Sequence, residues 1–176
     1  GFIGRFFIDN LKQREGDIYV LTRKGSEKKL ENLQERMGDQ ADRLIPVNGD
    51  LRQPLLGLDE ATVADIKGNV RHFCHFAAIY DLKASAESQI ATNIEGTRNA
   101  VQLAEALDAG CFQHASSIAA GGMYEGTWRE DMFEEAENMD HPYFATKHDS
   151  EGIVRRECKI PWRVYRPGMV VGHSKT

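Results

Sequence analysis

The 176-residue sequence lacks several features that would point to particular classes of protein. It has no apolar run long enough to span a bilayer and no charged-then-apolar segment of the kind that directs secretion. It has no basic excess: its net charge is −5, which argues against a nucleic-acid surface and gives an anionic membrane no attraction. Cysteines are few, odd in number and widely spaced, at Cys74, Cys111 and Cys158, which favours a reducing cytoplasmic compartment over a disulfide framework.

Internal repeats and low-complexity linkers are also absent, so the length predicts one globular domain. Short apolar runs alternate with helical patterns, which is typical of βαβ units and a mostly parallel sheet. Right-handed crossovers then give a doubly wound, Rossmann-type α/β fold. The predicted strands are Asp17–Arg23, which we expect to be buried, Arg43–Asp50, Val70–Ala78, Cys111–Ala119 and Trp162–Pro167; the predicted helices are Phe2–Arg14, Glu27–Met37, Ala84–Ala109 and His141–Cys158.

The chain begins with a glycine pair, Gly1 and Gly4, that runs directly into a helix. Glycines let a backbone approach a pyrophosphate, and a helix N-terminus offers free N–H groups and a positive dipole end. Gly1, Phe2, Ile3 and Gly4 are therefore interpreted as part of a dinucleotide-binding turn. The first strand of such a fold lies in the middle of the sheet. We therefore expect residues 1–176 to be a partial NAD(P)-binding domain of a longer chain, without its first strand and its substrate-binding C-terminal portion.

Two basic residues, Arg23 and Lys24, lie where the residue that reads the cofactor ribose is expected. An acidic residue there would bind the ribose hydroxyls of NAD, whereas a basic pair can clamp the 2′-phosphate of NADP. We therefore favour NADP over NAD; the alternative is that both residues lie in a solvated loop.

The ends of the next two predicted strands also carry candidate cofactor contacts. Asp50 and Leu51 follow the second strand, where a carboxylate can accept a hydrogen bond from an adenine amine or form an Asx turn. Ala77 and Ala78 end the third strand with small side chains that leave room for a nucleotide.

A tyrosine and a lysine four residues apart, Tyr143 and Lys147, share one face of a predicted helix. A phenol with a pKa of about 10 is a poor proton donor or acceptor at neutral pH, and a nearby ammonium favours its ionised form. Ser116 and Ser117 end the fourth strand, where a hydroxyl can stabilise a developing oxyanion or cap its own backbone.

In combination, these motifs resemble the extended short-chain dehydrogenase/reductase superfamily, and the resemblance covers essentially the whole chain. The motifs occur in the order of the superfamily: GFIG, GDL, HFAA, NIEGTRN, SSIAAGG, YFATK and YRPGMVVG. The resemblance selects Ser117, five residues before Gly122, as the catalytic serine, and Tyr143 and Lys147 as the catalytic pair.

The resemblance also assigns residues to the surroundings of the cofactor. It places Asn93, on a helix, in support of the site, and the turn of Arg166, Pro167 and Gly168 beside the nicotinamide. It implies that Ser117 and Tyr143 stabilise the oxyanion formed by hydride transfer from the cofactor, that Tyr143 donates a proton, and that Lys147 lowers the pKa of the tyrosine.

Within the superfamily, the segments YVLTRK, NIEGTRNAVQLAE and IPWRVYRPGMVVGHSKT look most like the fatty acyl-CoA reductase and thioester reductase branch. This implies NADPH-dependent reduction of a fatty acyl-CoA thioester to an aldehyde, and further to an alcohol in some members. The alternatives are a nucleotide-sugar epimerase or dehydratase, against which Arg23 counts, another carbonyl or hydroxysteroid reductase, and a non-catalytic NAD(P)-sensing module.

Two remaining features are given structural interpretations. His72 and Cys74 face away from His75 on a strand, so no metal site is expected. The acidic segment Glu125–Asp140 is interpreted as a solvated loop with a short helix; in the alternative, its residues Trp128, Met132 and Phe133 line the mouth of an acyl site.

Overall fold

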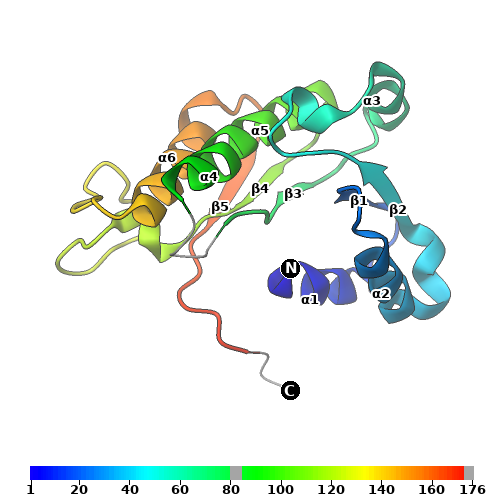
Figure 1. The fold of residues 1–176 in the computed structure, drawn as a ribbon, viewed down its shortest axis with the longest axis horizontal. Helices are drawn as coiled ribbons and strands as arrows, with labels where there is room; N and C mark the ends of the chain where they lie inside the picture. The colour runs from blue at the N-terminus through cyan, green and yellow to red at the C-terminus, as the bar shows by residue number, and fades with distance from the viewer. Residues whose placement is uncertain (80–84, 173–176) are drawn as a thin grey trace.

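The computed structural model describes residues 1–79 and 85–172 and has the predicted α/β architecture (Figure 1). The strands are β1 (Ile18–Thr22), β2 (Leu44–Asn48), β3 (Phe73–His75), β4 (Phe112–Ala115) and β5 (Trp162–Tyr165). The helices are α1 (Phe2–Leu11), α2 (Glu27–Met37), α3 (Glu60–Ile66), α4 (Ala86–Gln89), α5 (Gly96–Ala106) and α6 (Pro142–Glu157), with short helices η1 (Gly38–Arg43), η2 (Pro54–Gly57), η3 (Ile90–Glu95) and η4 (Ile118–Gly121).

All strand pairs in the described residues are parallel, as predicted, but they form two sheets. One sheet has the order β1-β2 and the other the order β3-β4-β5. Within the described residues, β1 and β3 each have one edge without a partner strand.

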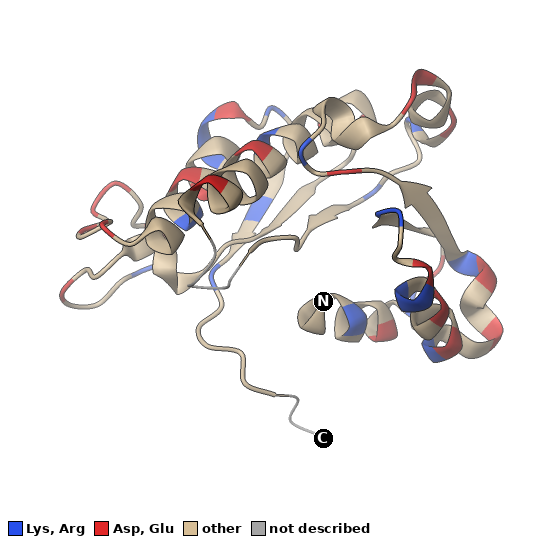
Figure 2. Cartoon of the chain, in the orientation of Figure 1, with Lys and Arg blue, Asp and Glu red and all other residues tan. Residues whose placement is uncertain are grey.

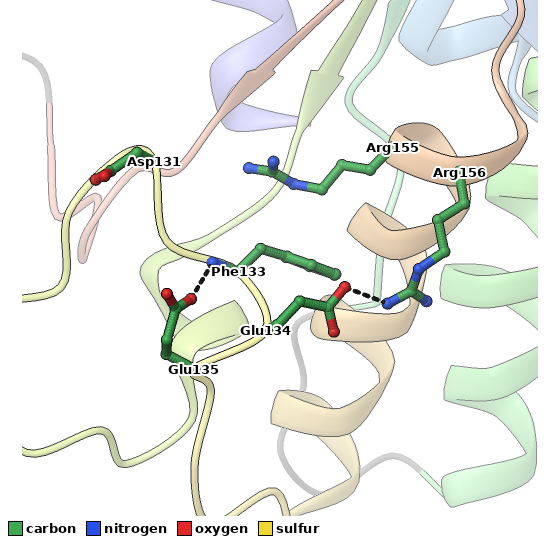
Figure 3. Close-up of a pocket in the computed structure, with 6 residues that line it drawn as sticks. All are labelled: Asp131, Phe133, Glu134, Glu135, Arg155 and Arg156. Carbon is green, nitrogen blue, oxygen red and sulfur yellow. Dashed lines mark hydrogen bonds and ion pairs between the residues drawn. The ribbon is translucent and has the colours of Figure 1, made fainter.

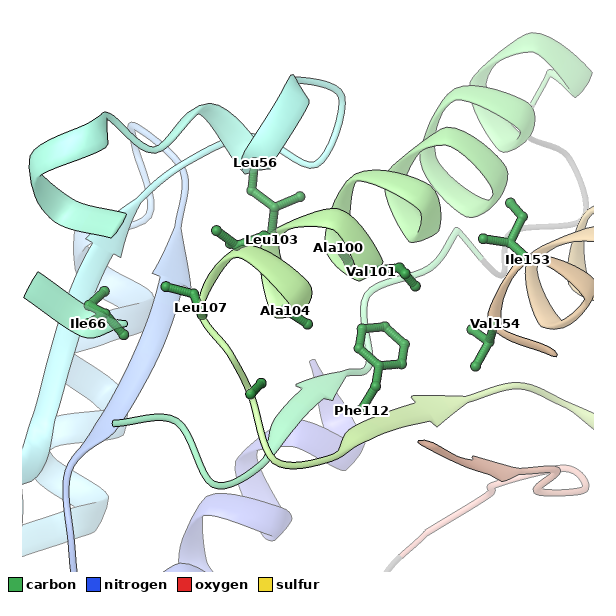
Figure 4. Packing of buried hydrophobic residues seen from close by; sticks show 11 residues of the cluster. Leu56, Ile66, Ala100, Val101, Leu103, Ala104, Leu107, Phe112, Ile153 and Val154 are labelled. Atoms are coloured by element: carbon green, nitrogen blue, oxygen red, sulfur yellow. The ribbon is translucent and has the colours of Figure 1, made fainter. Parts of the chain in front are cut away.

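The larger sheet carries most of the core on the face that α4, α5 and α6 cover in Figure 1. Phe112 on β4 is fully buried beneath α5 and α6 (Figure 4). Ala100 and Ala104 are fully buried on α5, and their small side chains let that helix approach closely. Leu56 of η2 and Ile66 of α3 extend the same cluster.

The smaller sheet is less completely covered than predicted. Ile18 and Val20 of β1 pack with the buried residues Ile8, Met37 and Leu44. The alternate residues Tyr19 and Leu21 remain 39% and 36% exposed, so β1 is half-buried on one face and exposed on the other, and the expectation of a buried strand is wrong. Pro46 is accommodated because β2 lies at a sheet edge.

The structure corrects two predicted segments. The long helix predicted over Ala84–Ala109, whose first residue lies outside the described residues, is interrupted by the π-helical η3 and ends at Ala106. No helix is found between residues 122 and 141, where a short one was expected.

The strands end earlier than predicted because the chain turns away at the carboxyl edge of the sheet, where η4 begins after β4. In the described residues, no helix has both the length and the hydropathy required to cross a bilayer.

Candidate active site

The ends of β4 and β5 form the centre of the candidate site. Parallel pairing puts Ala115 opposite Tyr165, so the chain leaves both strands at the same edge of the sheet. Just beyond, the backbone N–H of Ile118 donates to the carbonyl oxygen of Pro167 at 3.2 Å. This bond places Ser117 directly beside the turn that contains Pro167 and Gly168.

The predicted tyrosine–lysine pair lies on the first two turns of α6. His141 caps the helix by accepting a hydrogen bond from the Tyr143 backbone at Nδ1 (3.1 Å), and Pro142 fits the first helical position. Lys147, only 3% exposed, donates from Nζ to the carbonyl oxygen of Ala115 at 2.9 Å. Lys147 therefore ties the tyrosine helix to the end of the serine strand.

Burial also changes the proton affinity of this lysine. Desolvation disfavours the ammonium and lowers the pKa of Lys147 to about 8, while the negative charge of Glu151 acts in the opposite direction. Lys147 is therefore charged at neutral pH and loses its proton in the mildly alkaline range.

The two serines have different environments. Ser116 is buried and donates from its hydroxyl to Glu151 Oε2 at 2.7 Å. Ser117 is half-buried, and its Oγ accepts from the Ala119 backbone N–H at 3.1 Å, capping η4. The hydroxyl hydrogen of Ser117 can still be donated, because the cap uses only a lone pair.

Asn93 holds the segment that follows β3. It lies in the π-helical η3, a rare form that is frequent at functional sites. Its Oδ1 accepts from the Ile79 N–H at 2.8 Å, and its Nδ2 donates to the Ile79 carbonyl at 3.1 Å and to Thr146 Oγ1 at 3.2 Å. Asn93 thus fixes the backbone just beyond Ala77 and Ala78 and links it to α6.

The residues after β2 form a compact turn. The Asp50 carboxylate accepts from the Arg52 backbone at 3.0 Å and pairs with its guanidinium at 2.7 Å, as in the Asx-turn alternative. These contacts lower the pKa of Asp50 to about 2. A Cβ on Gly49 would collide with the backbone carbonyl oxygen of Leu56, so glycine is required there. Leu51 packs in the core, and its carbonyl oxygen accepts from Asn99 at 2.8 Å.

The predicted phosphate-binding residues lie around the smaller sheet. Arg23 and Lys24 are exposed after β1, and neither forms an ion pair within the described part of the chain. Phe2 and Ile3 open α1, and a Cβ on Gly1 or Gly4 would meet nothing within 4 Å. α1 approaches the end of β3 through Phe7 and Phe76, whose ring centroids are 5.0 Å apart.

Glu151 is a central residue that sequence reasoning missed. Its carboxylate has no exposed surface and accepts from Ser116, from Arg155 Nε at 2.7 Å and from Arg166 Nη2 at 2.6 Å. Burial favours the neutral acid, but hydrogen bonds from Arg166, Ser116 and Arg155 outweigh it and lower the pKa of Glu151. The sequence signal was an acid four residues after Lys147. Because the Arg166 side chain points to Glu151, only the backbone of that residue is left to face a cofactor.

Acidic residues are spread along the loop between η4 and α6 (Figure 2), but buried side chains keep it from being solvated throughout. Met132 and Phe133 are buried, and the Phe133 ring stacks on His148 with centroids 4.2 Å apart. Figure 3 shows Phe133 beside Arg155 and Arg156 in a pocket that Asp131, Glu134 and Glu135 complete. Met132 and Phe133 thus anchor the loop to α6, and the alternative in which Trp128, Met132 and Phe133 line the mouth of an acyl site stays a prediction.

A second hollow borders the start of α6. It is lined by Gly122, Met123, Tyr124, Glu125, Asn138, Asp140, His141 and Phe144, the last two of which flank Tyr143 in the sequence. Gly122 is required here: it has a φ of +65°, and a Cβ would collide with the Glu137 carbonyl oxygen.

The arrangement fits a dinucleotide. Gly1 and Gly4 leave the start of α1 open, and the basic pair after β1 forms no ion pair within the described residues, although the Asp50 carboxylate interacts electrostatically with Arg23. Polar groups at the ends of β3, β4 and β5 are held in place by buried side chains. Among the described residues, no group of three or more His, Cys, Asp or Glu side chains could hold a metal ion.

The sequence matches the protein family described as "Male sterility protein" over residues 1–176. It is 31% identical over its whole length to a linear gramicidin synthase of Brevibacillus parabrevis, of which it covers 4%. It is 24% identical, over 99% of its length, to a putative fatty acyl-CoA reductase of Drosophila melanogaster, of which it covers 42%.

The fold is similar to that of the terminal R domain from the myxalamid PKS-NRPS biosynthetic pathway. The TM-score is 0.84 at 27% identity, over 99% of this chain and 48% of that one. Like the sequence relatives, this structure is at least twice as long as the chain described. The motifs, the parallel sheets and the family match agree: the chain belongs to the male sterility protein family, in the fatty acyl-CoA reductase and thioester reductase branch of the extended short-chain dehydrogenase/reductase superfamily of NAD(P)-dependent oxidoreductases.

Proposed function

We propose that the protein is an NADPH-dependent reductase that converts an acyl thioester, with fatty acyl-CoA as the first candidate, to an aldehyde and in a further step to an alcohol. The observation that carries this proposal is the bond from buried Lys147 to the end of the serine strand. It puts Ser117 next to the helix on which Tyr143 precedes the lysine by one turn.

The chain's own residues have separable roles in this proposal. Ser117 and Tyr143 donate hydrogen bonds to the carbonyl oxygen of the thioester as negative charge develops there. Tyr143 donates its phenolic proton to that oxygen, and charged Lys147 favours the resulting phenolate. The carbonyl then re-forms as the carbon–sulfur bond breaks, and the hydroxyl proton passes by way of the Tyr143 phenolate to the leaving sulfur, which departs as the free thiol.

A nicotinamide dinucleotide, when bound, supplies the hydride for the reduction. We propose that the start of α1 (Gly1, Phe2, Ile3 and Gly4) holds its pyrophosphate and that Asp50, Leu51, Ala77 and Ala78 border its adenosine portion. Asn93, Pro167 and Gly168 shape the nicotinamide end, where Tyr143 and Lys147 contact the ribose. Arg23 and Lys24 bind the 2′-phosphate, which is our reason for preferring NADPH.

Two carriers of the acyl group are candidates: coenzyme A and a carrier domain. The similarity to a fatty acyl-CoA reductase supports a coenzyme A thioester. The similarity to a gramicidin synthase and to an R domain of a PKS-NRPS pathway supports a thioester on a carrier domain. Both carriers present the same thioester to Ser117 and Tyr143.

The test uses the full-length protein. Absorbance at the NADPH wavelength and release of free thiol are followed with palmitoyl-CoA and with an acyl group loaded on a carrier domain, with NADPH or NADH. We expect one thiol released for each aldehyde formed, and faster turnover with NADPH. Arg23→Ser should raise the KM for NADPH about 10-fold while leaving NADH unchanged, whereas Lys28→Ser, on exposed α2, serves as the matched control. Absence of turnover with every acyl thioester, together with tightly retained NAD, would favour the nucleotide-sugar alternative.

A further inference from the structure

The buried carboxylate of Glu151 joins several separate parts of the candidate site. It accepts hydrogen bonds from three different parts of the chain: Ser116 after β4, Arg155 on α6, and Arg166 after β5. A carboxylate without exposed surface is costly to bury, and it is tolerated only when charged or polar partners satisfy it. Four such contacts within 3.0 Å fulfil this condition.

Two of the three partners of Glu151 adjoin a residue of the candidate site. Ser116 immediately precedes Ser117, and Arg166 immediately precedes Pro167, whose carbonyl oxygen is bonded to Ile118. Glu151 itself lies one helical turn after Lys147.

Arg166 extends the network to the acidic loop. Its guanidinium donates to the carbonyl oxygens of Met132 at 2.7 Å and Arg129 at 3.1 Å. It also lies over the ring of Trp128, 5.1 Å from the centroid. The ends of β4 and β5, α6 and the loop are therefore joined through one carboxylate.

We propose that Glu151 is a positioning residue of the active site. It holds Ser117, the Pro167–Gly168 turn and Lys147 in fixed positions relative to one another, and it supplies the negative charge next to Lys147. This inference rests on the proposed function, in which Ser117, Tyr143 and Lys147 perform the chemistry.

The charged and titratable groups around Lys147 allow the direction of the effect to be worked out. On α6, Glu151 is its anionic neighbour, and this anion is paired with Arg155 and with Arg166 from the β5 side. From β3 and β4, His75 and His114 are near enough to interact with Lys147, and both are uncharged at neutral pH because burial lowers the pKa of each. Replacing Glu151 by glutamine removes the anion and leaves two unpaired guanidinium groups, so Lys147 should lose its proton at a lower pH.

The experiment compares Glu151→Gln with Glu157→Gln in the full-length protein. Glu157 is on the same helix but pairs with Arg98 at the surface, which makes it a matched control. For Glu151→Gln we expect kcat with palmitoyl-CoA to fall about 10- to 100-fold, with the KM for NADPH changed less than about threefold. The alkaline limb of the kcat profile should move down by about half to one pH unit. Glu157→Gln should match the wild type.

The readouts separate positioning from a merely structural role. A lower melting temperature with an unchanged kcat and pH profile would overturn the proposal. If Glu151→Gln does not fold, Ser116→Ala, which removes one contact, carries the test: a lower kcat supports the proposal and a wild-type kcat overturns it.

Failure of the proposed function can be distinguished from failure of the proposal for Glu151. If the wild type reduces no acyl thioester, the pH dependence of NADPH binding, followed by cofactor fluorescence, replaces kcat. A midpoint that Glu151→Gln shifts to lower pH supports the proposal, and an unmoved midpoint overturns it.

Discussion

The two sheets of the molecule differ in how much they bury and in where their polar groups lie. Among the described residues, the β3–β5 sheet and its helices form a core cluster of eleven buried residues, whereas the cluster beneath β1 and β2 has three. The polar residues of the larger part, Lys147, Glu151 and Asn93, are buried and hydrogen-bonded. In the smaller part, Arg23 and Lys24 are exposed. The groups proposed for chemistry are thus held before any ligand arrives, and those proposed to choose the cofactor are free to adapt.

The largest effect should come from the larger core. Phe112→Ala removes a fully buried ring and should lower the free energy of unfolding by about 4 kcal/mol. Ile8→Ala, in the smaller cluster, should cost about 2 kcal/mol, the lower end of the range for such changes. Hydrogen exchange and urea unfolding of the two variants in the full-length protein measure this contrast. Equal losses would mean that the two parts are a single cooperative core.

Acidification should destabilise the β3–β5 sheet and its helices through two buried histidines. Burial lowers the pKa of His75 to about 3 and also lowers that of His114. Below about pH 6.5 these two histidines bind protons in the unfolded chain but not in the folded chain. The free energy of unfolding therefore falls as the pH drops below this value. Between pH 7.5 and 5.5, above the range in which the carboxylates titrate, each histidine should cost about 1.4 kcal/mol.

His114→Leu tests this pH effect at one residue. Neither ring nitrogen of His114 has a hydrogen-bond partner in the described residues, so leucine should not weaken folding at pH 7.5. It should remove about half of the acid-induced loss in urea-unfolding experiments. An acid sensitivity equal to that of the wild type would contradict the assignment.

Gly122, in the loop after η4, and Gly4, at the start of α1, should respond differently to substitution by alanine. Gly122→Ala, at a φ of +65° and against the Glu137 carbonyl oxygen, should destabilise the loop after η4 by about 1–3 kcal/mol. Gly4→Ala meets open space within a helix and should be neutral, or stabilising by up to about 1 kcal/mol. If the start of α1 binds the pyrophosphate, Gly4→Ala should nevertheless weaken NADPH binding, measured by cofactor fluorescence. Unchanged binding would place the pyrophosphate elsewhere.

The sequence predicted the fold class and the strand–helix order because the alternation of apolar runs and helical patterns is a local signal. The assignment of Ser117, Tyr143 and Lys147 to one catalytic set came from the family resemblance rather than from local patterns, and it stays a prediction. The exposure of Tyr19 and Leu21 was not predictable, because it depends on which elements pack against that face of β1. Periodicity likewise could not locate the π-helical break at Asn93, where a side chain bonds to the distant backbone of Ile79.

The Glu151 network was missed for a different reason. Its partners Ser116, Arg155 and Arg166 are separated by up to 50 positions, and an acid on a helix is usually exposed. Only tertiary packing shows that this carboxylate has no exposed surface. The same holds for Phe133, an aromatic residue in an acidic loop, whose stacking on His148 no local pattern indicates.

The most direct test of the account is the turnover of Tyr143→Phe in the full-length protein, with NADPH and palmitoyl-CoA or a carrier-bound acyl thioester. Tyr19→Phe, on the open face of β1, is the matched control. The account predicts that kcat falls about 10²- to 10⁴-fold in Tyr143→Phe, with NADPH still bound, and stays at the wild-type value in Tyr19→Phe. Thiol release that continues at the wild-type rate in Tyr143→Phe would contradict the account.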